Sequence, residues 1–301
     1  MKIKESNPKI KYFNLLLVSA VSAVFLTVLR CVQVGTVIDA STGFYTEKGF
    51  LVVLFYILLF GVCAAIAVLS FLSRESRDVE ISKIKSTPLF AVSLLFALTV
   101  FYDGASSFVQ SVLGAGETQY ASSAFKSLML SGSLPLFLRS VFALLSGIFF
   151  IELAVSFKKG DGSASKHKIA ALMPVAWVGC RLLHLFVRKI SFMRVSDLFL
   201  ELSMCALAVL FFMALAQVSS GVYSDDSRWR LAGFGLPAMV FAFVISVSRL
   251  IFTVIDKSTY INENHPFNIS DLVFAVFVLC LVLALSKKRS HVQKEESDIV
   301  S

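Results

Sequence analysis

The chain has 301 residues, of which 57% are hydrophobic and 16% are charged, and its mean hydropathy is +0.80. Soluble domains are about 45–50% apolar and about 25% charged, so this composition excludes a water-soluble fold and predicts a protein embedded in lipid. The net charge of +8 does not indicate nucleic-acid binding, because the basic residues stand in short clusters between apolar runs. We expect such clusters to contact anionic lipid headgroups.

Apolar runs long enough to cross a bilayer recur along the chain. A helix needs about 20 apolar residues to span roughly 30 Å of hydrocarbon. We therefore expect an all-α bundle with eight transmembrane helices, at 13–34, 50–72, 89–111, 135–157, 169–187, 197–219, 231–254 and 270–286. The first run is longer than an ordinary signal-peptide core, so we expect it to be retained as a span. The spans form one domain, 13–286, between a basic N-terminus at 1–12 and a charged tail at 287–301.

Prolines mark several helix positions. Pro88 and Pro135 stand at expected helix starts, where a missing N–H has no intrahelical partner to lose. Pro174 and Pro237 fall within the first halves of their spans, where we expect kinks.

The basic residues between the spans predict the orientation of the chain. If the N-terminus is inside, the inner segments carry 18 Lys and Arg residues and the outer loops carry 6, and the remaining four arginines lie within spans. This alternation predicts that both termini are cytoplasmic in a plasma membrane.

Cysteines and histidines give no sign of a cofactor. All five cysteines lie inside apolar segments, and the four histidines are scattered without a zinc-binding spacing. We expect no disulfide, no metal site and no cofactor.

Each odd-numbered span carries one charge near its expected outer end. These charges are Arg30, Asp103, Arg181 and Arg249, at intervals of 73, 78 and 68 residues. Two even-numbered spans also match each other, since both contain Ser-Asp-Leu followed by an apolar run, at 196–198 and 270–272. We interpret the chain as four related helical hairpins.

Further charges from the even-numbered spans are expected at the same depth, namely Arg139, Asp197, Glu201 and Asp271, whereas Glu152 lies nearer the inner side. A charge at bilayer depth costs at least about 2.5–3.5 kcal/mol, so these side chains are expected to face the bundle interior. One interpretation is a set of interhelical ion pairs, with Asp197 and Asp271 acting chiefly as helix N-caps.

The other interpretation is a polar crevice open to the outside. Arginine holds carboxylate and phosphate through paired hydrogen bonds, so the crevice would bind an anionic or zwitterionic small molecule or a lipid headgroup. The candidate ligand-binding residues are Arg30, Asp103, Arg139, Arg181, His184, Glu201 and Arg249.

Two segments carry a resemblance to known sequences. VIDASTGFYTEKGF at 37–50 and RVSDLFLELSMCALAVLFFMALAQVSSGVYS at 194–224 resemble segments of multi-pass membrane proteins from Gram-positive anaerobic bacteria. That group has no assigned activity, so the resemblance implies a prokaryotic plasma membrane and assigns no functional residue.

Three functions are compatible with these patterns. A small-molecule transporter or substrate-binding membrane component agrees best with the repetition, the depth of the charges and the prolines at 174 and 237. The alternative is a sensory or accessory subunit that docks a membrane-protein partner and uses its ion pairs to set helix register. An enzyme is not expected, because no hydrolase or protease motif is present and only Glu201 with His184 offers an acid–base couple.

Overall fold

The computed structural model of the chain describes residues 8–39, 45–46, 49–73, 81, 84–116, 129, 132–162, 167–187, 195–221, 227–255 and 267–300. Its helices are α1 (Pro8–Thr36), α2 (Phe50–Leu72), α3 (Thr87–Gly116), α5 (Leu134–Lys159), the short 3₁₀ helix η3 (Ala170–Leu172), α6 (Met173–Val187), α7 (Val195–Ser219), α8 (Ser227–Val254) and α9 (Ile269–Val300). An isolated β-bridge joins Ile38 to Tyr45 in the segment after α1.

The eight expected spans are confirmed as helices. Within the described ranges, eight helical segments are long and apolar enough to cross a membrane, with mean hydropathies from 1.7 to 2.9. The chain is therefore an all-α, multi-pass integral membrane protein. Two helices run beyond their predicted bounds: α1 begins at Pro8, and α9 continues through the charged tail as far as Val300.

Three of the four prolines considered above lie in the first turn of a helix. Pro88 and Pro135 do so in α3 and α5, as expected. Pro174 does not kink a helix interior, because the 3₁₀ turn η3 precedes it and α6 begins at Met173. Pro237 lies inside α8, which remains one helix from Ser227 to Val254.

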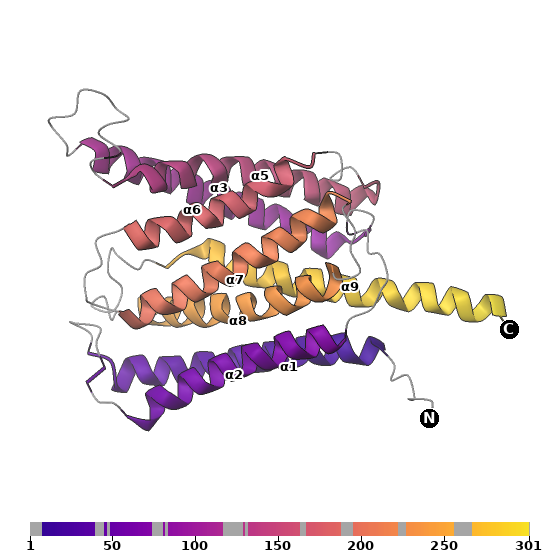
Figure 1. The fold of residues 1–301 in the computed structure, drawn as a ribbon, viewed down its shortest axis with the longest axis horizontal. Helices are drawn as coiled ribbons and strands as arrows, with labels where there is room; N and C mark the ends of the chain where they lie inside the picture. Colours follow the sequence, from indigo (N-terminus) through magenta and orange to yellow (C-terminus); the bar gives the residue numbers. More distant parts are fainter. Residues whose placement is uncertain are drawn as a thin grey trace.

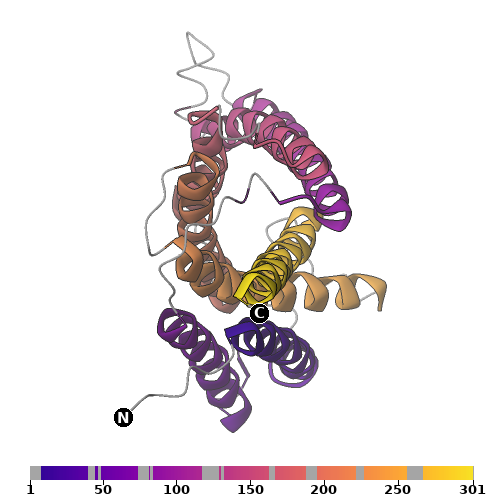
Figure 2. The ribbon, with the colours of Figure 1, turned by 90° about the vertical axis from the view of Figure 1, so that its right-hand side faces the viewer.

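Six helices form a closed ring. Each of α3, α5, α6, α7, α8 and α9 packs on its neighbour in that order, and α9 packs back on α3. Figure 2 shows this ring from one end, with α1 and α2 outside it. The order places α6 and α9 on opposite sides of the ring, each with two helices between it and the other in either direction. Two side chains that meet from α6 and α9 must therefore cross the interior.

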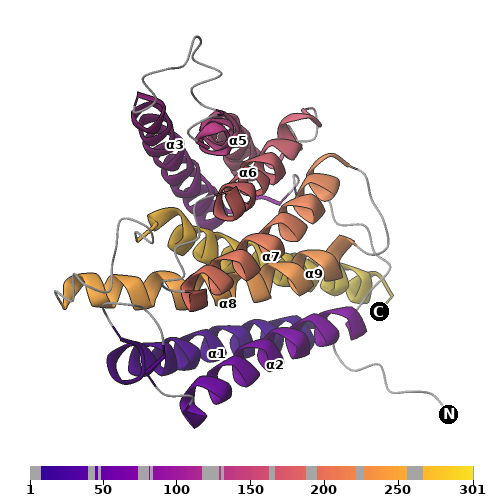
Figure 3. The ribbon, with the colours of Figure 1, turned by 60° about the vertical axis from the view of Figure 1, so that its left-hand side comes forward.

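The remaining two helices form a hairpin that packs on the outside of the ring. Both α1 and α2 contact α8, and α1 also contacts α9 (Figures 1 and 3). Because α8 has neighbours in the ring and the hairpin on its outer face, 83% of its apolar 18-residue stretch is buried. The corresponding share for α2 is 22%. The long apolar faces of α2 are left for lipid.

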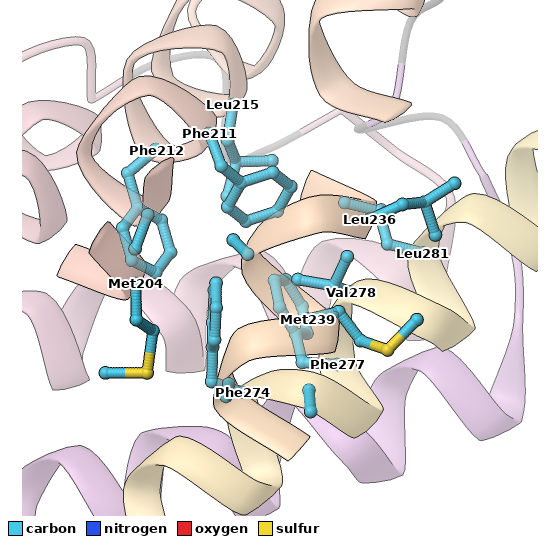
Figure 4. Packing of buried hydrophobic residues seen from close by; sticks show 14 of the residues in the cluster. Met204, Phe211, Phe212, Leu215, Leu236, Met239, Phe274, Phe277, Val278 and Leu281 are labelled. Atoms are coloured by element: carbon cyan, nitrogen blue, oxygen red, sulfur yellow. The ribbon is translucent and has the colours of Figure 1, made fainter. Parts of the chain in front are cut away.

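The middle of the ring is filled by aromatic side chains. Phe96 of α3 contacts Phe150 of α5, Trp177 of α6, Phe212 of α7 and both Phe274 and Phe277 of α9, at ring-centroid distances from 4.6 to 6.4 Å. Figure 4 shows part of this packing, with Phe211, Phe212, Phe274 and Phe277 beside Met204 and Met239. This aromatic layer fills the ring interior next to the charged residues that are described in the following subsection.

One glycine allows α3 and α5 to approach closely next to a charged residue. A Cβ atom added at Gly104 would lie 3.1 Å from the Cβ of Ala143 and 3.3 Å from the backbone oxygen of Ser140. Gly61 of α2 has no such neighbour within 4 Å. Close backbone approach through small residues is a common basis of helix packing in membranes.

Replacing Gly104 by valine is expected to push α3 away from α5 and to lower the unfolding free energy by about 1–3 kcal/mol, as overpacking does elsewhere. Thermal unfolding of the purified protein in detergent measures the effect. Gly61→Val is the matched control and should leave the melting temperature nearly unchanged. Equal losses for the two variants would contradict this account of the α3–α5 contact.

Candidate functional site

Four ion pairs lie towards one end of the bundle, where α1, α3, α6 and α8 end and α2, α5, α7 and α9 begin. We call this the distal end, because α1 begins and α9 ends at the other (Figure 1). Each pair joins one arginine to one acid: Arg30–Asp197, Arg139–Asp103, Arg181–Asp271 and Arg249–Glu201. Seven of the eight side chains are buried, and Arg139 is largely buried. Ion pairing removes much of the cost of burying these charges away from water.

The pair formed by Arg181 and Asp271 crosses the ring. Arg181 of α6 donates two hydrogen bonds to the two carboxylate oxygens of Asp271 of α9, one of them 2.7 Å long between Nη2 and Oδ2. Both residues are buried, with exposures of 7% and 4%. Because α6 and α9 lie on opposite sides of the ring, this bidentate contact ties two walls that are not neighbours. We call it the cross-ring pair.

Asp103 of α3 has hydrogen-bond partners on three other segments. It receives hydrogen bonds from Arg139 of α5, including one of 3.2 Å from Nε, and a 2.9 Å bond from the indole N–H of Trp177 on α6. The side-chain amide of Asn268, just before α9, donates a longer bond of 3.5 Å. One carboxylate therefore connects α3 to α5, α6 and the start of α9.

Arg249 of α8 binds Glu201 on the neighbouring helix α7. Arg181 interacts electrostatically with Glu201 and Asp103 as well as with Asp271, so the three pairs inside the ring form one electrostatic group. The candidate residues Asp103, Arg139, Arg181, Glu201 and Arg249 thus come together in one group.

Arg30 lies outside this group, and its placement corrects the prediction that it shares the crevice. It binds Asp197 at 2.6 Å, with Gln33 and Tyr45 also near its guanidinium group at 3.2 and 3.4 Å. The guanidinium carbon stands 5.7 Å from the ring centroid of Phe55 on α2. Arg30 therefore fastens the α1–α2 hairpin to the start of α7, and we call Arg30–Asp197 the hairpin pair.

A small cavity lies beside the cross-ring pair. Its volume is about 10 Å³, which holds about one water molecule. Arg181, Asp271, Ser270 and Cys205 line it together with aromatic side chains that include Trp177, Phe212 and Phe274. At this cavity Arg181 and Asp271 occupy each other, and the aromatic layer fills the space below them.

The remaining predicted residues have mixed outcomes. His184 lies half-buried on α6, one turn beyond Arg181, and Glu201 binds Arg249. Glu152 stands apart, as expected, and binds His167 at 3.1 Å. Among the described residues, no three His, Cys, Asp or Glu side chains gather closely enough to hold a metal ion.

Asp197 and Asp271 were predicted to act chiefly as helix caps, and this prediction missed their partners. Both do lie in the first turns of their helices, α7 and α9, but each carboxylate binds an arginine from another helix. Sequence reasoning also missed Trp177 and Asn268 as partners of Asp103. Trp177 precedes Arg181 by four residues and so shares its helix face, which is the signal that could have found it.

Comparison of the chain with protein-family models, with curated proteins and with solved structures gives no match.

Replacing Asp103 by the isosteric asparagine is expected to lower the unfolding free energy by about 3–5 kcal/mol, because it leaves the guanidinium of Arg139 buried without its counter-ion. Denaturation in detergent micelles measures the loss. Glu152→Gln is the matched control. Its pair is far more exposed, with side chains 33% and 64% accessible, so the expected change is below about 1 kcal/mol. A loss for Asp103→Asn no larger than that of the control would show that the buried pair is not structural.

Proposed function

We propose that the protein is a small-molecule transporter or substrate-binding component of a bacterial-type plasma membrane, without catalytic activity. Its site is the distal interior of the six-helix ring, and its ligand is a small anionic or zwitterionic molecule or a lipid headgroup. The observation that carries the proposal is the cross-ring pair, a bidentate arginine–carboxylate contact between opposite walls beside a small, mostly apolar cavity.

The position of the cross-ring pair distinguishes it from a purely structural contact. Neighbouring helices are held by continuous packing along their length, as α3 and α5 are, and a buried ion pair adds little stability over an apolar pair of similar size. A contact across the ring, in contrast, has two natural states. While Arg181 binds Asp271 the interior is closed, and a ligand that binds Arg181 in place of Asp271 would open it.

The hydrogen-bonding chemistry of Arg181 supports a charged ligand. The guanidinium of Arg181 uses two of its five N–H groups on Asp271, in the paired geometry that also binds carboxylate or phosphate. Bundles built from related helical hairpins commonly carry substrate sites at the interfaces between hairpins. Arg181 and Asp271 belong to different hairpins of this chain, α6–α7 and α8–α9.

Access from the distal end is tested with the native thiol of Cys205, which lines the cavity and is fully buried. In a variant that keeps only this cysteine, a charged methanethiosulfonate applied from outside the cell should react slowly. Replacing the cross-ring pair by Arg181→Met and Asp271→Leu removes the attraction and leaves no unpaired charge, so the rate should rise at least about tenfold.

The control replaces the hairpin pair in the same way, by Arg30→Met and Asp197→Leu. That pair is equally buried but lies outside the ring, so the labelling rate of Cys205 should not change. Equal slow labelling in all three proteins would contradict the proposal.

A second function is favoured by two observations: each of the four intramembrane arginines binds an acid, and the cavity holds about one water. An accessory or sensory subunit that scaffolds another membrane protein needs such pairs only to set helix register. Slow labelling of Cys205 in both double variants, together with stable copurification of one membrane partner, would favour this function.

The proposed orientation places both termini in the cytoplasm and the distal end outside. Green fluorescent protein fused after Ser301 should fluoresce, and alkaline phosphatase fused there should be inactive. Phosphatase fused after Val187, which follows five spans, should be active because an odd number of crossings exports it. The reverse pattern would contradict the orientation, and the site would then face the cytoplasm.

A further inference from the structure

Among the residues that the structure describes, the charges inside the ring are electrically balanced. Arg139, Arg181 and Arg249 face three acids, Asp103, Glu201 and Asp271, and the six charges form one group inside a low-dielectric enclosure. A ligand that enters this space must leave the balance nearly intact, because uncompensated charge in such surroundings is strongly unfavourable.

The balance discriminates between classes of ligand. A monoanion that displaces Asp271 from Arg181 would satisfy the arginine but leave the aspartate buried without a counter-ion. Breaking a buried pair in this way typically costs a factor on the order of 100 to a few thousand in an equilibrium constant. A cation that displaces Arg181 from Asp271 would incur the corresponding cost. A molecule that carries both charges replaces both partners at once.

The surroundings of the two residues suit the two ends of such a molecule. Arg181 has a planar guanidinium group that can donate two parallel hydrogen bonds to a carboxylate or phosphate. Asp271 lies beside Phe274, and the same cavity is lined by Trp177 and Phe212. Aromatic faces next to a carboxylate are the surroundings that favour a substituted ammonium group.

We infer that the ligand is zwitterionic, with its carboxylate or phosphate on Arg181 and its ammonium group on Asp271 beside the aromatic side chains. The inference rests on the proposed function and narrows its substrate class. The ligand replaces the cross-ring pair as one bridging unit, so binding separates α6 from α9 without leaving an unpaired charge. Free amino-acid-like solutes and lipid headgroups share this chemistry.

The structure also supplies a reporter for the test. The chain has two tryptophans, and Trp229 contacts Phe71 and Phe234 far from the cavity. In a Trp229→Phe protein, all tryptophan fluorescence comes from Trp177, whose indole N–H binds Asp103 and whose ring lines the cavity. A ligand that replaces the cross-ring pair changes the environment of this indole.

The full-length Trp229→Phe protein in detergent is titrated with three probes of similar shape: glycine betaine, which is a zwitterion; 3,3-dimethylbutyrate, which keeps only the carboxylate; and choline, which lacks it. Glycine betaine should bind at least about tenfold more tightly than either singly charged probe. Phosphocholine and a short-chain phosphatidylcholine form a second arm. Tighter binding of the lipid than of both soluble zwitterions identifies a headgroup, and the opposite order identifies a free solute.

Two variants should switch the preference. Asp271→Asn leaves Arg181 with a surplus positive charge, so 3,3-dimethylbutyrate should become the tightest probe. Arg181→Gln leaves Asp271 with a surplus negative charge, so choline should become the tightest probe. Arg30→Gln, in the hairpin pair outside the ring, should keep the wild-type order.

The outcomes separate the two proposals. Tightest binding of 3,3-dimethylbutyrate or of choline to the protein with its cross-ring pair intact would overturn the zwitterion inference and leave the proposed binding site standing. No fluorescence or melting-temperature change with any probe would overturn both. If the single variants do not fold, the order of the three probe affinities for the unaltered site still tests the zwitterion inference.

Discussion

The hydrocarbon core of a bilayer contains no water to solvate a buried charge, so an ionised side chain inside this bundle needs a partner on another helix. Four arginines and four acids meet this constraint one to one. The pairs connect α1 to α7, α3 to α5, α6 to α9 and α7 to α8, so they specify which helices meet as well as neutralising charge. Packing of aromatic and small side chains supplies the contact area, and the ion pairs select the arrangement.

The four pairs have different structural roles because they lie at different places relative to the ring. Arg139–Asp103 and Arg249–Glu201 join neighbouring helices and strengthen the wall. The hairpin pair attaches two lipid-facing helices to the outside of the ring. The cross-ring pair joins opposite walls, and it is the contact whose opening would expose the interior. The proposed function follows from this difference in position, since all four pairs are contacts between an arginine and a carboxylate.

The spans could be predicted from sequence because crossing hydrocarbon requires length and hydropathy, which are local properties. The common depth of the charges could be predicted for the same reason, from their distance to the helix ends. Partner choice could not, because it depends on the order of helices around the ring. Asp271 was therefore interpreted as a cap when it binds Arg181, and Arg30 was assigned to the crevice when it lies outside. Pro174 lies near the start of its span, and sequence alone did not show that a 3₁₀ turn would precede it.

The claim on which the rest depends is that Arg181 and Asp271 bind each other across the ring, and reversing their charges tests it most directly. Arg181→Asp and Asp271→Arg each place like charges together, and each should destabilise the protein severely. Combining them restores the attraction, so the double variant should recover most of the lost unfolding free energy, with a coupling of at least about 2 kcal/mol in a double-mutant cycle. A double variant whose loss equals the sum of the two single losses would show that these residues do not bind each other, and the proposed site would then lose its basis.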